Sequence, residues 1–204
     1  MIPRWLKILY TLFVAVLVPV YWVRYGPANF LWACDIALLV TVVALWRESR
    51  LLASMMAVAV LLPELLWNLD FFLRLITGRD VIGLDATGYM FNPQQPLLVR
   101  LLSLFHVFLP LLLLSLLWRL GYSARAGLAT TALCWLVLPL SYLCTDPARN
   151  INWVYGWGGA PQTWLPGPVY VALLMLMLPL CIYLPTHLVL KRLFGKSIAP
   201  TMAP

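Results

Sequence analysis

Six long runs of apolar residues, separated by shorter polar stretches, make up almost the whole chain. Each run is close to the roughly 20 residues that an α-helix needs to cross the hydrocarbon core of a bilayer. We therefore predict an all-α, polytopic membrane protein built as a six-helix transmembrane bundle. Residues 1–196 should form a single domain and residues 197–204 a short disordered tail. The predicted spans are 5–23, 29–46, 51–76, 98–120, 125–145 and 168–193.

The positions of the basic residues predict the orientation of these helices. Cytoplasmic loops carry an excess of Lys and Arg. If both termini lie in the cytoplasm, nine of the 14 Lys and Arg residues fall on that side and five on the other. The pattern predicts a multi-pass protein of the cell (inner) membrane with cytoplasmic termini. The two long connections, 77–97 and 146–167, then face the exterior or periplasm.

The composition agrees with a membrane protein and excludes nucleic acid as a partner. Hydrophobic residues make up 63% of the chain and charged residues 10%, against about 25% charged residues in a soluble domain. The net charge of +7 comes from residues at helix ends and in loops, where they meet anionic lipid. The expected partners are membrane lipids, and a homo-oligomer or a larger membrane complex stays open.

The four cysteines give no sign of a disulfide or of a zinc-cysteine motif. They have no close spacing and fall mostly within the apolar runs, at Cys34, Cys134, Cys144 and Cys181. A thiol in such a place behaves as a small hydrophobic group.

Four ionisable residues lie inside the predicted spans instead of at their ends. At a rise of about 1.5 Å per residue, Asp35 and Asp70 lie roughly 9 Å and His106 roughly 12 Å from the exterior ends of their helices. Glu64 lies deeper, at roughly 18 Å. An acid facing lipid costs about 2.5–3.5 kcal/mol near the bilayer centre. We therefore expect these side chains to face inward and to meet in the exterior half.

Two chemistries fit this group, beside a purely structural role in helix packing. His106 with Asp35 and Asp70 could bind a divalent metal that activates water. Alternatively, His106 is a general base oriented by Asp70 or Asp35, with Ser103 one helical turn away as the nucleophile. Glu64 supports either site.

Pro110 adds an argument for a special environment at His106. A proline removes one backbone donor and leaves the carbonyl four residues earlier free, which here is the carbonyl of His106. Asn68 is a further polar group expected near this site. His187, the second histidine, falls near the cytoplasmic surface, so we expect an interfacial or capping role for it.

The predicted substrate-binding residues lie toward the exterior. Arg74 and Arg100, near the exterior ends of their helices, could snorkel outward or hold an anionic head group. The second long connection mixes amides, aromatics and glycines, as a substrate-contacting loop does. Asn150, Asn152 and Trp153 are its candidate residues, although aromatics there also fit interfacial anchors.

Four strings carry a resemblance to known proteins: Asn29-Phe-Leu-Trp-Ala-Cys-Asp35, Arg100-Leu-Leu-Ser-Leu-Phe-His106, Asn150-Ile-Asn-Trp-Val and Leu184-Pro-Thr-His187. The chain resembles a family of bacterial multi-pass membrane proteins without an assigned activity. The resemblance implies a bacterial membrane location, and it carries over no catalytic role to any residue of this chain. The chain is also similar, more loosely, to membrane hydrolases of the alkaline ceramidase type, but it differs from them in its possible metal ligands. Those enzymes hold zinc with three histidines, and this chain has two.

The leading hypothesis is a hydrolase or transferase that acts on a lipid or lipophilic substrate. The alternatives are a small proton- or cation-coupled transporter and a non-catalytic accessory subunit of a membrane complex. A transporter needs polar groups along the whole membrane, whereas an enzyme needs only a pocket on one side.

Overall fold

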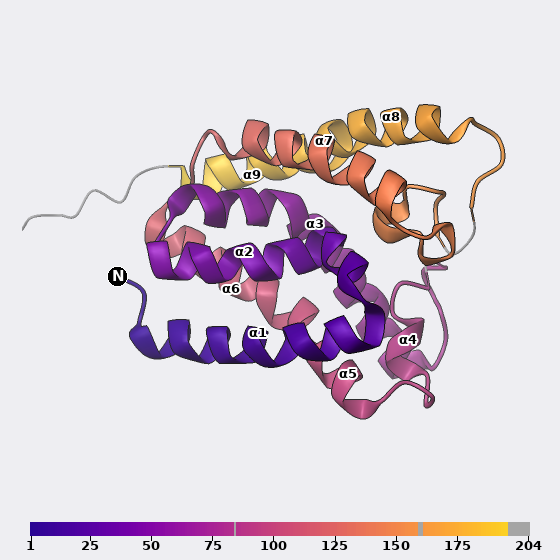
Figure 1. Cartoon of the computed structure of the whole chain (residues 1–204). Helices are drawn as coiled ribbons and strands as arrows, with labels where there is room; N and C mark the ends of the chain where they lie inside the picture. Colours follow the sequence, from indigo (N-terminus) through magenta and orange to yellow (C-terminus); the bar gives the residue numbers. More distant parts are fainter. Residues whose placement is uncertain (84, 159–160, 196–204) are drawn as a thin grey trace, which may run out of the picture.

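The computed structural model describes residues 1–83, 85–158 and 161–195. Within these ranges the fold is entirely helical and contains no strand. The long helices lie roughly along one axis, with the N-terminus and the end of α9 (Leu184–Phe194) at one end of the bundle. The two long connections lie at the opposite end (Figure 1). The predicted tail at 197–204 lies outside the described residues.

Five helical segments of the described chain are long and apolar enough to cross a membrane, which indicates a membrane protein. They are α1 (Arg4–Tyr25), α3 (Arg50–Thr77), the pair α5 (Leu97–Leu102) and α6 (Phe105–Leu120), α7 (Ala126–Cys144), and the run from α8 (Gly167–Leu178) through η4 (Pro179–Tyr183) to α9. The prediction of six spanning helices is not confirmed. The remaining helix, α2 (Ala33–Arg47), has 15 residues and is about 22 Å long.

The shortness of α2 has a local cause. Gly26 adopts φ 76°, and the chain then forms a single 3-10 segment, η1 (Pro27–Leu31), instead of starting an α-helix at residue 29. Trp32 is extended, with φ −56° and ψ 134°, and α2 begins after it. The polar residues of the predicted second span therefore lie at a helix entrance.

Two other predicted spans are interrupted but remain continuous in direction. Ser103 and Leu104 form a turn between α5 and α6, so the imidazole of His106 belongs to the first turn of α6. In the last span, the five residues of η4 form a wide π-helical turn between α8 and α9. Prolines at 179 and 185 remove two backbone donors there, which favours such a wide turn.

The central helix of the bundle is α3, which packs against α2, α6 and α7. Its 28 residues include eleven buried ones, and its neighbours contribute large buried side chains such as Leu45, Leu109, Leu113 and Leu117. Because α3 is enclosed, polar groups on it face other helices and not lipid. The short helix α4 (Gly88–Phe91) and the 3-10 segments η2 (Pro147–Arg149) and η3 (Ile151–Trp153) lie in the long connections.

Candidate functional site

The centre of the candidate site is a buried pair between Glu64 on α3 and His106 on α6. The imidazole Nδ1 lies 2.9 Å from Oε1 and 2.8 Å from Oε2 of the carboxylate. Only 2% of the Glu64 side chain and 11% of the His106 side chain are exposed. Within the described residues, Nε2 of His106 has no hydrogen-bond partner. The carboxylate therefore fixes one ring nitrogen and leaves the other available.

Neighbouring aromatic rings hold the imidazole in place. Trp67 stacks on one side, with ring centroids 4.4 Å apart, and Phe105 stacks at 4.1 Å. Glu64 and Trp67 are three residues apart on α3, so both face the first turn of α6. The imidazole is thus bonded at one edge and packed on its faces.

The main chain of His106 is held from the same face of α3. Asn68 Nδ2 donates to the His106 carbonyl at 2.7 Å and to the Glu64 carbonyl at 2.7 Å. Pro110 cannot donate to the His106 carbonyl, as predicted from the sequence. The amide of Asn68 takes the place of the missing backbone donor.

Asp35 lies in the first turn of α2 and belongs to a polar chain that leads toward the second long connection. Asn29 Nδ2 donates to Asp35 Oδ2 at 2.8 Å, and Arg149 Nη2 donates to Asn29 Oδ1 at 3.1 Å. Asp35 Oδ1 is buried and has no partner within the described residues. Asp35 is thus a second buried carboxyl group, at the start of α2.

Asp70, which was predicted to meet Asp35 and His106, makes its hydrogen bonds elsewhere. Its Oδ2 accepts from the backbone N of Thr87 at 2.9 Å and from the Thr87 hydroxyl at 2.7 Å. Among the described residues, no hydrogen bond joins Asp70 to Asp35 or His106. In this arrangement Asp70 ties the first long connection to α3.

Ser103, the predicted nucleophile, lies beside α1 and not against the imidazole. Its hydroxyl shares a hydrogen bond of 2.6 Å with the hydroxyl of Tyr21 and donates to the Val99 carbonyl at 3.1 Å. In the described part of the chain it has no hydrogen bond to His106. A role as nucleophile stays a prediction.

The two predicted arginines are held by the first long connection. Arg74 Nη2 lies 3.2 Å from Asp80 and 2.8 Å from Asp85. Arg100 Nη1 donates to the carbonyl of Met90 at 3.3 Å. These contacts stabilise the loop, and a contact with a head group stays a prediction.

The amides of the second connection hold the backbone of the loop and of α2. Asn150 Nδ2 donates to the carbonyls of Gly156 and Gly158. Asn152 Oδ1 accepts from the backbone N of Ala33 at 3.0 Å, at the start of α2. Trp153 has a positive φ of 57° and packs near Trp157, with ring centroids 4.7 Å apart. These residues position the entrance of α2, and substrate contact by them is untested.

Sequence reasoning missed one residue of the site, Cys34. Its Sγ, a carboxylate oxygen of Glu64 and a ring nitrogen of His106 all lie within 4.8 Å of one another. Thiolate, carboxylate and imidazole are the three ligand types that zinc takes in proteins. These residues, in place of the predicted set of Asp35, Asp70 and His106, could hold a metal. One feature of the sequence could have pointed to Cys34 as a site residue, because it directly precedes Asp35, an ionisable residue inside a predicted span.

The buried carboxylates and the buried imidazole of the described residues lie in one half of the bundle. Among the described residues, every buried carboxylate and the buried imidazole lie between the long connections and the level of Glu64. The other half contains buried apolar side chains, such as Leu45, Ala57 and Leu116. Its buried hydroxyls bond to backbone carbonyls, as Thr41 does to Ala37. The site is therefore one-sided.

Comparisons of the chain with protein-family models, with curated proteins and with solved structures found no match in any of the three.

Proposed function

We propose that this protein is a membrane-embedded hydrolase or transferase that acts on a lipid or another lipophilic substrate. The observation that carries the proposal is the buried Glu64–His106 pair, with Nδ1 held at 2.8–2.9 Å by both carboxylate oxygens. A carboxylate that accepts the Nδ1 proton orients the ring and stabilises its protonated form. This is the arrangement that proton transfer during hydrolysis or group transfer requires.

In the proposed reaction, Nε2 of His106 accepts a proton from the attacking water or alcohol. The proton is then passed to the leaving group of the substrate. In this scheme the Glu64 carboxylate does not take the transferred proton. It holds His106 in the tautomer that carries hydrogen on Nδ1. General base catalysis of this type contributes about 10²–10⁴ in rate.

The one-sidedness of the polar groups favours an enzyme over a transporter. A proton or cation relay would need ionisable groups along the full length of the bundle. The hydrogen-bonded chain from Arg149 through Asn29 ends at Asp35. Among the described residues, the polar groups on the far side of Glu64 are hydroxyls and the partly buried His187, which bonds to Tyr122. The proximity of Asp35 and Glu64 is what remains in favour of a proton-coupled transporter, and an accessory subunit would need no such pair.

Turnover of a lipid panel by the purified protein in detergent micelles tests this proposal. The panel should include ester, amide and phosphodiester lipids, with products followed by mass spectrometry. His106→Gln and Glu64→Gln should each lower turnover by at least about 10², while Asp85→Asn, an exposed carboxylate at the same end, should leave it unchanged. Wild-type protein without activity on any lipid, or a His106→Gln variant with full activity, would contradict the proposal.

The proposal includes an orientation, with both termini cytoplasmic and both long connections outside an inner membrane. It is supported by the distribution of basic residues and by the position of the N-terminus and of α9 at one end. A cysteine introduced at Asp85, in a background where the two exposed cysteines are replaced (Cys144→Ser and Cys181→Ser), should react with an impermeant thiol reagent on intact cells. Labelling only after the cells are opened would reverse the orientation.

A further inference from the structure

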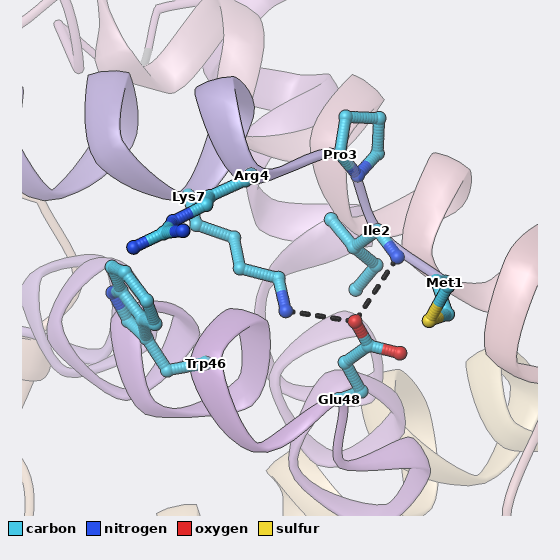
Figure 2. Close-up of a pocket in the computed structure, with 7 residues that line it drawn as sticks. All are labelled: Met1, Ile2, Pro3, Arg4, Lys7, Trp46 and Glu48. Carbon is cyan, nitrogen blue, oxygen red and sulfur yellow. Dashed lines mark hydrogen bonds and ion pairs between the residues drawn. The ribbon is translucent and has the colours of Figure 1, made fainter.

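A cavity of about 510 Å³ lies at the end of the bundle opposite the candidate site. It is formed between the first turn of α1 and the last turn of α2, and Figure 2 shows the side chains that line it. They are Met1, Ile2, Pro3, Arg4, Lys7, Trp46 and Glu48.

The cavity is lined by two basic side chains, Arg4 and Lys7, and by one acidic side chain, Glu48. Glu48 Oε1 accepts from Lys7 Nζ at 2.7 Å and from the backbone N of Ile2 at 3.1 Å, so this carboxylate is already engaged with one cation. Arg4 has no ion pair or hydrogen bond to its side chain within the described ranges. Figure 2 shows its guanidinium extended past Lys7 and over the Trp46 side of the cavity. One exposed cation is therefore left for a ligand.

The cavity lies where a lipid head group would be. On α1, exposed apolar side chains follow Arg4 directly, at Trp5, Ile8, Leu9 and Leu12. Trp46 is 48% exposed, and its indole Nε1 donates to the Thr11 hydroxyl at 2.9 Å. Exposed tryptophans with a bonded N–H are typical of the membrane interface. The cavity thus opens at the boundary between polar and apolar surface.

We propose that this cavity binds the head group of an anionic phospholipid. The planar guanidinium of Arg4 can donate two parallel hydrogen bonds to a phosphate. The Lys7–Glu48 pair closes the opposite wall, and the acyl chains would lie along the apolar face of α1. Two further basic residues lie next to lining residues: Arg47 adjoins Trp46 in the chain, and Arg119 Nη1 donates to the Met1 carbonyl at 3.5 Å. Clusters of basic residues attract anionic lipid. The proposal does not depend on the proposed enzyme activity.

The test compares lipids on the purified full-length protein by native mass spectrometry, with dissociation constants from lipid titration. Phosphatidylglycerol should bind at least tenfold more tightly than phosphatidylcholine. Arg4→Gln should remove this preference, and its exposed side chain allows the change without loss of fold. Arg125→Gln, which removes an exposed arginine near the same end but outside the cavity, should preserve the preference.

Three results would overturn the proposal. The first is equal affinity for the two lipids, and the second is an equal effect of Arg4→Gln and Arg125→Gln, which would indicate diffuse attraction and not a site. The third uses free glycerol phosphate as the competitor. If it displaces the lipid at similar concentrations, the cavity binds phosphate from solution and the lipid assignment fails.

Discussion

The side-chain amide of Asn68 donates to the main-chain carbonyl of His106 across the interface between α3 and α6, at 2.7 Å. Pro110 stands at the position whose backbone N–H would otherwise donate to this carbonyl, and a proline has no such donor. The hydrogen bond from Asn68 therefore replaces the backbone bond that is missing at His106, the candidate catalytic residue. It makes Asn68 a positioning residue for the first turn of α6.

Replacing Asn68 by Leu should destabilise the protein by about 1–3 kcal/mol, because the part-buried His106 carbonyl loses its side-chain donor. Unfolding in mixed micelles, followed by circular dichroism, measures the change. Ser115→Ala, which removes an exposed hydroxyl bonded to its own helix, should shift stability by less than about 0.5 kcal/mol. A similar loss in both variants would argue against a special role for Asn68.

Glu64 and His106 should behave as a coupled pair in a double-mutant cycle. Removing one partner of a buried hydrogen-bonded pair costs about 1–3 kcal/mol, because the other is left without its counterpart. The double variant Glu64→Gln with His106→Gln should therefore lose less stability than the sum of the single losses. Strict additivity in the unfolding measurements would show that the two side chains do not interact in the membrane.

Asn152→Ala should destabilise the start of α2 by about 0.5–2 kcal/mol, the usual effect of losing a side chain that caps a helix. Amide hydrogen exchange of residues 33–36 should rise in the variant and stay unchanged in Asn92→Ala, a control in the other connection. If turnover falls while exchange at α2 is unaltered, Asn152 contacts substrate, as the sequence predicted.

Metal analysis decides whether Cys34, Glu64 and His106 hold an ion. If they do, protein purified with added zinc should carry about one equivalent, because three ligands with an open position suit this metal. Cys34→Ala should abolish binding, and Cys144→Ala, at an exposed thiol, should not. Zinc bound equally by both variants would place it elsewhere, and full turnover without metal would leave His106 as a free base.

Stability should decrease in acid partly through Glu48. Its pKa lies below the ordinary value because Lys7 donates to the carboxylate, with the backbone N of Ile2 adding to the effect. Because the pKa of Glu48 is lowered in the folded protein, its contribution to stability is complete when the pH is above the ordinary pKa of a glutamate. This contribution is lost as the pH falls through the lowered pKa. Between pH 7 and pH 3, Glu48→Gln should therefore lose less stability than the wild type in parallel melts, and identical losses would refute this assignment.

The hydropathy pattern predicted the long helices closely, because membrane spans need an unbroken apolar run. The third span was expected at 51–76 and is Arg50–Thr77, and the fifth was expected at 125–145 and is Ala126–Cys144. The start of the second span was missed. Its cap is Asn152, about 120 positions later in the chain, and no local pattern encodes so distant a contact.

The candidate site could be predicted only in part. Depth along a helix follows from the rise per residue, and it placed Glu64 below His106, whereas the two side chains bond to each other. The direction in which each side chain points depends on the rotation of the helix. That rotation pairs His106 with Glu64 and leaves Asp70 to Thr87. The thiol of Cys34 was interpreted as a small hydrophobic group because it lies in an apolar run.

The confinement of the buried carboxylates to one half of the bundle has an electrical consequence. Among the described residues, the side chains packed around Leu45, Ala57 and Leu116 in the other half are mostly apolar. A charge at the level of Glu64 is therefore separated from the far surface by packing of low dielectric constant, in which electrostatic interactions are stronger than in water.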